Sequence, residues 1–137
     1  MRLPLKIEYA TRALVQLART YERGEVRRAE ELAEAEALSP HYLVQILNEL
    51  RPAGLVASRR GKNGGYLLAR RPEEISLLDI AQALEGRVLE LNDPEGGESG
   101  PAAAGAWKEV FAGLEKALSE WTLADLLSDG SSADWVI

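Results

Sequence analysis

The sequence predicts a mainly α-helical protein with one small β-hairpin and a long C-terminal helix. Apolar residues recur every three or four positions in five segments, at residues 5–21, 28–37, 39–51, 76–86 and 106–121, which is the spacing of amphipathic helices. A single segment, residues 55–69, combines strand-like residues with glycine-rich turn chemistry and predicts a hairpin. Residues 86–105 hold five glycines and two prolines, so we expect a flexible loop between residues 1–85 and residues 106–137.

Composition excludes several classes of protein. With 46% hydrophobic and 28% charged residues, the chain can build a core. It contains no cysteine, which excludes disulfides, thiolate metal sites and cysteine nucleophiles. No stretch reaches the roughly 18 apolar residues of a membrane span, and the N-terminus lacks the apolar run of a signal peptide. We therefore expect a cytoplasmic protein without a membrane partner.

The charge is divided unevenly along the chain. The net charge of −6 combines +5 over residues 1–72 with −11 over residues 73–137. Because binding of a polyanion depends on the local surface and not on the net charge, the first half is a candidate for nucleic-acid contact. The acidic second half is not.

The first two helical segments predict part of a compact core. In residues 5–21 the expected inward positions are Leu5, Tyr9, Ala13, Leu14, Leu17, Ala18 and Tyr21. Residues 28–37 are rich in alanine and glutamate, and their apolar side is small. A small apolar side suits the first helix of a helix-turn-helix, where the two helices cross closely, but a generic surface helix has the same composition.

Residues 39–51 begin with a clear helix start signal. Ser39 can serve as the N-cap, and Pro40 fits the first helical position. An apolar stripe follows, at Leu43, Ile46, Leu47 and Leu50. The opposite face holds Pro40, His41, Val44, Gln45 and Asn48.

That opposite face holds the candidates for contact with bases. Glutamine and asparagine can pair bidentately with adenine, although a surface glutamine is more often solvated. His41 is the only histidine, so it cannot be part of a histidine metal site. It is either a contact to a DNA phosphate or a solvated residue of the first turn.

The stretch "LVASRRGKNGGYLLA" predicts a basic hairpin directly after this helix. Arg59, Arg60 and Lys62 lie at its tip, Arg70 and Arg71 lie just beyond, and residues 50–72 contain no acid. Such a hairpin suits phosphate contacts and insertion into a minor groove, whereas a merely solubilising hairpin usually carries both signs. A helix delivered by a tight turn and followed by a basic hairpin predicts a winged helix-turn-helix, with residues 1–85 as the DNA-binding domain.

The helix after the hairpin is expected to close this domain. Ser76 and Asp79 fit a capping box, and the expected inward residues are Leu77, Ile80, Ala81 and Leu84. The helix should stop at Gly86.

The last long helix, at residues 106–121, has one broad apolar face made of Trp107, Val110, Phe111, Leu114, Ala117, Leu118 and Trp121. We expect this face to pair with the same helix of a second subunit, because a two-fold dimer doubles the DNA contact. Packing back onto its own domain is the alternative. The tail is expected to place Trp135 and Ile137 against this helix.

In collinear order from residue 1 to about residue 127, the chain resembles the winged helix-turn-helix repressors of the IscR, NsrR and CymR type, the Rrf2 family. The resemblance rests on "YATRAL", "SPHYLVQILNELRPAGLV", "SRRGKNGGYLLAR", "ISLLDIAQALEG" and "WKEVFAGLEKALSEWTLADLL". It implies a homodimer that is paired through the long helix and binds a palindromic operator in double-stranded DNA. It also implies that Ser39, His41, Tyr42 and Gln45 meet the DNA and that Arg60 enters the minor groove.

The chain departs from this family at three places and matches it at a fourth, Glu8. Cluster-bearing members carry three cysteines in the loop that reads "LNDPEGGESGPAAAG" here; an iron–sulfur cluster normally needs thiolates, so we expect no metal and no cofactor. Glu8 matches a position that lends the cluster a carboxylate in some relatives, but we expect a surface or intersubunit acid. Val44 replaces an acid and favours contact with a thymine methyl group. Ala37 replaces the usual turn glycine, at a strain of about 1 kcal/mol if its backbone is left-handed.

The sequence therefore predicts a cluster-free transcriptional regulator, expected to be a repressor, that binds a palindromic operator as a homodimer. The predicted DNA contacts are Ser39, His41, Tyr42, Gln45, Asn48, Arg59, Arg60 and Lys62. The predicted dimer contacts are Trp107, Val110, Phe111, Leu114, Leu118 and Trp121. The alternative is a regulator or interaction module controlled by a partner metabolic enzyme or a small ligand. We expect no enzyme, because no phosphate-binding glycine loop precedes a helix and no catalytic constellation is present.

Overall fold

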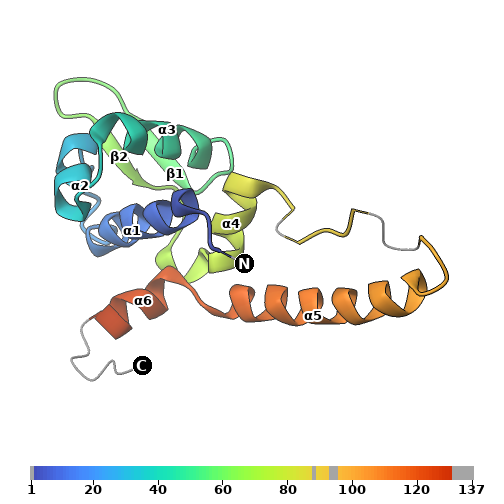
Figure 1. Cartoon of the computed structure of the whole chain (residues 1–137). Coiled ribbons are helices and arrows are strands. Elements are labelled where there is room, and N and C mark those ends of the chain that lie inside the picture. Colours follow the sequence, from blue (N-terminus) through green and yellow to red (C-terminus); the bar gives the residue numbers. More distant parts are fainter. Residues whose placement is uncertain (1, 88, 93–95, 131–137) are drawn as a thin grey trace.

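The computed structural model describes residues 2–87, 89–92 and 96–130. The elements in chain order are α1 (Leu5–Arg19), α2 (Ala29–Glu36), α3 (Pro40–Leu50), β1 (Val56–Arg59), β2 (Gly65–Leu68), the 3-10 helix η1 (Pro72–Glu74), α4 (Leu77–Glu85), α5 (Gly100–Glu120) and α6 (Leu123–Gly130). Figure 1 shows α1 to α4 and the hairpin gathered in one unit, with α5 extending away beneath it. This confirms the predicted fold class of a mainly helical protein with one small hairpin.

The core of this unit lies where α1, α3 and α4 meet. The stripe predicted on α3 is confirmed, because Leu43, Ile46, Leu47 and Leu50 are fully buried. The inward face predicted for α1 is right around Leu14 but wrong at Leu5, which is 59% exposed. Leu5 precedes Leu14 by nine residues, which is about two and a half helical turns, so the two side chains lie on opposite faces of the helix. Ile7 and Ala10 occupy the inward positions instead.

A tight turn joins α2 to α3. Ala37 ends α2 with φ 56° and ψ 45°, the left-handed conformation considered from the sequence. No other non-glycine residue in the described part of the chain has a positive φ. The Ser39 hydroxyl then accepts a hydrogen bond from the Tyr42 backbone N–H at 3.4 Å, so the predicted N-cap of α3 is confirmed.

The hairpin is fixed to the domain at its base. β1 and β2 are antiparallel and run from the pair Val56–Leu68 to the pair Arg59–Gly65. Arg27, in the α1–α2 connection, adds a third partner, since its backbone N–H and C=O exchange two hydrogen bonds of 2.7 Å with Tyr66. This contact explains Gly65, where a Cβ would lie 2.6 Å from the carbonyl oxygen of Arg27. At Gly64 a Cβ would lie 2.2 Å from the Arg59 carbonyl oxygen.

The predicted capping box of α4 is confirmed, with Ser76 and Asp79 each bonding the other's backbone N–H. The predicted end of that helix at Gly86 is also confirmed.

The prediction of an irregular loop as far as residue 105 is wrong at its end, because α5 begins at Gly100. Pro101 was counted as a breaker, but proline is favoured in a first helical turn and the three alanines after it are strong helix formers. The predicted positions of Trp135 and Ile137 lie outside the described residues.

The far end of α5 is tied to the core. The Leu77 N–H bonds the Trp121 carbonyl oxygen at 2.9 Å, and the Leu123 N–H bonds the Ile75 carbonyl oxygen at 3.0 Å. Leu123 is fully buried. Among the described helices, none combines the length and hydropathy that crossing a bilayer requires.

Candidate nucleic-acid interface

The exposed face of α3 brings together three of the predicted contact residues. His41, Gln45 and Asn48 are exposed, and Val44 beside them is half-buried. His41 Nε2 lies 3.4 Å from Gln45 Nε2, so the two side chains can share a hydrogen bond one helical turn apart. This face therefore presents amide and imidazole groups that can bond base edges or phosphates.

The other two residues predicted on this helix lie at the margin of that face. Ser39 is exposed, but its hydroxyl caps α3. The half-buried Tyr42 ring packs edge-on against Tyr9, with ring centroids 5.9 Å apart. Both residues thus have a local structural role beside any contact with DNA.

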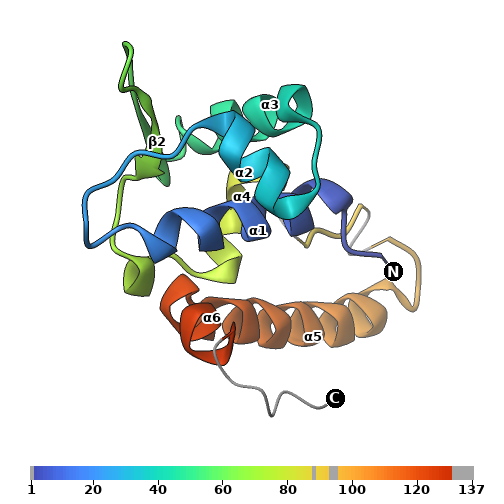
Figure 2. The same cartoon turned by 90° about the vertical axis from the view of Figure 1, so that its left-hand side faces the viewer.

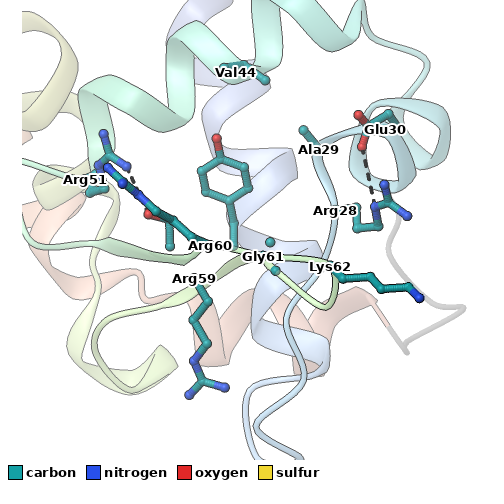
Figure 3. A pocket seen from close by; sticks show the side chains of 13 residues that line it. Arg28, Ala29, Glu30, Val44, Arg51, Arg59, Arg60, Gly61 and Lys62 are labelled. Atoms are coloured by element: carbon teal, nitrogen blue, oxygen red, sulfur yellow. Dashed lines mark hydrogen bonds and ion pairs between the residues drawn. The ribbon is translucent and has the colours of Figure 1, made fainter.

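The hairpin presents the three predicted wing cations to solvent. Arg59, Arg60 and Lys62 are all exposed, and none forms an ion pair within residues 2–87, 89–92 and 96–130. In Figure 3, Arg59 points away from α3, as strand alternation requires, while Lys62 extends outward from the tip. The wing therefore carries positive charge that the described part of the protein leaves unneutralised.

Most other cations of the first half are held by acids. The pairs are Lys6–Glu49, Arg12–Glu8, Arg23–Glu25, Arg27–Glu31, Arg28–Glu30, Arg70–Asp79 and Arg71–Glu74. The sequence placed Arg70 and Arg71 with the wing cations, but in the structure they contact acids of η1 and α4. The hydrogen bond from Arg71 lowers the pKa of the Glu74 carboxyl, with coulombic attraction to the same residue as the second cause.

A cleft of about 400 Å³ lies between α2, α3 and the hairpin, and we call it the wing-base cleft. Its lining includes Arg28, Val44, Arg51, Ser58 and Tyr66, and also the three predicted wing cations Arg59, Arg60 and Lys62. Arg51 Nη1 donates to Ser58 Oγ at 2.9 Å, which links the end of α3 to strand β1. In Figure 3, Arg51 and Arg28 lie on opposite sides of the cleft.

From the sequence, no functional role was predicted for three polar residues of the cleft, Arg28, Arg51 and Ser58. In the sequence, Arg51 is the last residue of one predicted helix and Arg28 the first residue of another. A signal for Arg51 was present, since it is the first cation of the acid-free residues 50–72. Its link to Ser58 depends on how the hairpin folds against α3, which the local pattern does not contain.

The helix α5 presents a second surface, which is apolar. Trp107, Val110, Leu114 and Trp121 remain 53%, 58%, 39% and 40% exposed. Phe111 and Leu118 on the same face are half-buried. Large apolar side chains that gather on one face of a helix in this way are typical of an interaction surface.

The donor set does not fit an iron–sulfur cluster. The sequence has no cysteine, and the described residues hold no group of three or more His, Asp or Glu side chains able to bind a metal ion. Glu8 is engaged by Arg12, whose Nη2 lies 2.5 Å from its carboxylate.

Comparison with known proteins gives a consistent result. Residues 3–129 match the profile of the Rrf2 family, described as iron-dependent transcriptional regulator. A putative HTH-type transcriptional regulator of Mycobacterium tuberculosis is 42% identical over 131 residues, which cover 92% of this chain and 81% of that protein. CymR of Bacillus subtilis, an HTH-type transcriptional regulator, is 34% identical over 128 residues, which cover 93% and 91%.

Solved structures agree with these matches. The structure of CymR, the global cysteine regulator of B. subtilis, superposes with a TM-score of 0.82 at 33% identity, covering 93% of this chain and 97% of that one. IscR of T. potens superposes with a TM-score of 0.79 at 34% identity, covering 100% and 93%.

Proposed function

Because the chain belongs to the Rrf2 family of transcriptional regulators, we propose that it is a repressor that binds a palindromic operator as a homodimer and works without an iron–sulfur cluster. In this proposal α3 of each subunit enters a major groove and each hairpin reaches an adjacent minor groove. Ser39, His41, Tyr42, Gln45 and Asn48 supply the contacts from α3. Arg59, Arg60 and Lys62 supply those from the wing.

The observation that carries this proposal is the division between paired and unpaired cations. Arg12 on α1, Arg27 before α2 and Arg71 before η1 have acidic partners. Arg59, Arg60 and Lys62 of the wing have none in the described part of the chain. A cation without an acidic partner can neutralise a phosphate without first breaking an ion pair, and the counterions it displaces supply free energy of binding. The protein is acidic overall, but this surface is not.

The apolar face of α5 supports the homodimer. Leu114 stands seven residues from both Trp107 and Trp121. If the two α5 helices of the proposed dimer run antiparallel and cross at Leu114, Trp107 comes close to the partner subunit's Trp121, the residue that follows α5. This pairing removes the exposed apolar surface from water, and it places two DNA-reading units on one assembly.

The difference between this chain and the family description supports the proposal that the protein works without an iron–sulfur cluster. The description of the family names iron, and cluster ligation normally requires thiolates that this sequence lacks. Purified protein should be colourless and free of iron. Visible absorption from a bound cluster would overturn this part alone.

The decisive experiment is a footprint of the purified protein on genomic DNA fragments, followed by a reporter assay. We expect protection of a palindrome whose half-sites are spaced by about one helical turn or a multiple of it. Transcription from that promoter should rise when the gene is deleted. No protected palindrome at any site would remove the proposed function, and a fall in transcription would make the protein an activator.

Control by a small ligand is a second candidate function. A cleft of about 410 Å³ lies between α5 and residues 87 and 89–91, where Leu89, Leu91 and Phe111 provide apolar surface. Two cations, Arg87 and Lys108, and two acids, Glu90 and Glu115, also line it. Such a lining suits a small metabolite that has an apolar part and carries charges of both signs. A metabolite that raises the melting temperature and shifts operator affinity would support this role. A partner enzyme that alters operator affinity would support protein control instead.

A further inference from the structure

In the proposed complex, the geometry of the DNA duplex determines which part of the DNA lies between α3 and the hairpin. The two grooves of a duplex are separated by a sugar–phosphate strand. A protein that places a helix in the major groove and a wing in the adjacent minor groove therefore straddles one such strand. The surface between helix and wing must face its phosphates, and in this protein that surface is the wing-base cleft.

The cleft has the chemistry for this contact. Arg51 is exposed at the end of α3 and forms no ion pair in the described part of the chain. On the opposite side Arg28 meets Glu30 at 4.0 Å, with both side chains largely exposed, so this pair contributes little. Arginine is the side chain best suited to phosphate, because its planar fork can donate two parallel hydrogen bonds.

Ser58 gives Arg51 a defined position. Its hydroxyl accepts from Nη1 at 2.9 Å and occupies only one of the guanidinium's N–H donors, so the rest can reach a ligand. Ser58 stands opposite Tyr66 in the hairpin, on the face that lines the cleft. A long side chain that is already held loses less conformational entropy when it binds.

We propose that the wing-base cleft receives the backbone strand between the two grooves, that Arg51 contacts a phosphate of that strand, and that Ser58 is a positioning residue for its guanidinium. This inference rests on the proposed function. It assigns a role to two residues that lie on neither the base-reading face of α3 nor the wing tip.

The first test is the salt dependence of binding to a fluorescently labelled operator duplex, measured by anisotropy with the full-length protein. Arg51→Ala should lower the slope of log K against log salt by about 1.8, the value for two phosphate contacts, because each subunit of the proposed dimer loses one. Ser58→Ala should leave the slope unchanged and weaken binding about fivefold, because it removes the hydrogen bond that positions the Arg51 guanidinium. Arg71→Ala is the matched control, since Arg71 is held by Glu74, and should change neither quantity.

A second test locates the phosphate. Ethylation of phosphates on the strand between the grooves should block binding of the wild type. For Arg51→Ala one of those phosphates should no longer matter, which loss of fold stability alone would not produce. Arg51→Lys, which keeps the charge, should keep the salt slope.

Glu30 provides a test of the opposite sign, because it places an acid in the cleft lining. Glu30→Gln should tighten binding, whereas Glu34→Gln, the same charge change elsewhere on α2, should not.

The outcomes separate this inference from the function on which it rests. If the wild type binds the operator but Arg51→Ala keeps both its salt slope and its ethylation pattern, the cleft is not a phosphate site and the proposed function stands. If Ser58→Ala binds as tightly as the wild type, Ser58 is not a positioning residue. If the wild type binds no duplex at all, the proposed function fails first.

Discussion

The hairpin base gives the sharpest test of how the wing is held, through Gly65→Ala. The added Cβ would lie 2.6 Å from the Arg27 carbonyl oxygen, so the α1–α2 connection must retreat to at least the 3.4 Å of an ordinary contact. That movement breaks the two 2.7 Å hydrogen bonds between Arg27 and Tyr66. At about 1 kcal/mol for each bond, the substitution should cost about 2 kcal/mol of unfolding free energy. For a chain of this size that is a fall of about 7 °C in melting temperature.

Calorimetry at matched protein concentration measures this shift, because the stability of an oligomer depends on concentration. Hydrogen exchange at the Tyr66 amide should accelerate in the same variant. The matched control is Gly105→Ala in α5, where nothing lies within 4 Å of the new Cβ. It should raise stability by about 0.5 to 1 kcal/mol. An unchanged melting temperature and an unchanged Tyr66 exchange rate in Gly65→Ala would refute the steric reasoning.

Three further predictions follow from other parts of the structure. Ala37→Gly should raise the unfolding free energy by about 1 kcal/mol, measured by urea denaturation, because it relieves a left-handed alanine; no gain would mean that the turn is unstrained. Arg60→Ala should lower the salt slope of operator binding by about 1.8, one phosphate contact for each subunit of the proposed dimer, with Arg71→Ala as the paired-cation control; equal slopes in both would exclude a phosphate contact. Leu114→Glu should convert the proposed dimer to a monomer in analytical ultracentrifugation, and a dimer that persists would place the interface elsewhere.

The helices were predictable because their signals are local. The N-cap at Ser39 and the capping box at Ser76 depend on residues three positions apart, and the stripe of α3 repeats within a single helix. The start of α5 was misplaced for a local reason as well, since Pro101 has opposite meanings at the first turn and inside a helix. Pro101 therefore does lie at a helix boundary, but the residue type alone does not say whether a helix ends or begins there.

The contacts that build the candidate site were not predictable in this way. From the sequence alone, Arg60 and Arg71 cannot be told apart, because both are arginines in the acid-free residues 50–72. In the structure, η1 brings Glu74 within 2.9 Å of Arg71. Likewise the two glycines at the wing were explained from the sequence by turn formation. In the structure Gly65 is also needed because the backbone of Arg27, far away in the sequence, passes too close for a side chain. The pairing of Arg71 with Glu74, three residues later, depends on the 3-10 turn of η1, which was not predicted. The close approach of Arg27 to Gly65 arises only when distant segments meet in the folded chain.

The attachment of α5 determines how the two halves of the protein can communicate. Figure 2 shows α5 lying along the underside of the domain and turning into α6 at one end. At that end Trp121 and Leu123 are hydrogen-bonded to Leu77 and Ile75, and Thr122 and Asp125 cap the next helix. The C-terminal end of α5 is therefore held rigidly against the DNA-binding domain. In the proposed dimer, a change in the angle between the two α5 helices rotates the two DNA-binding domains relative to each other, so this angle sets the distance between the two α3 helices on DNA.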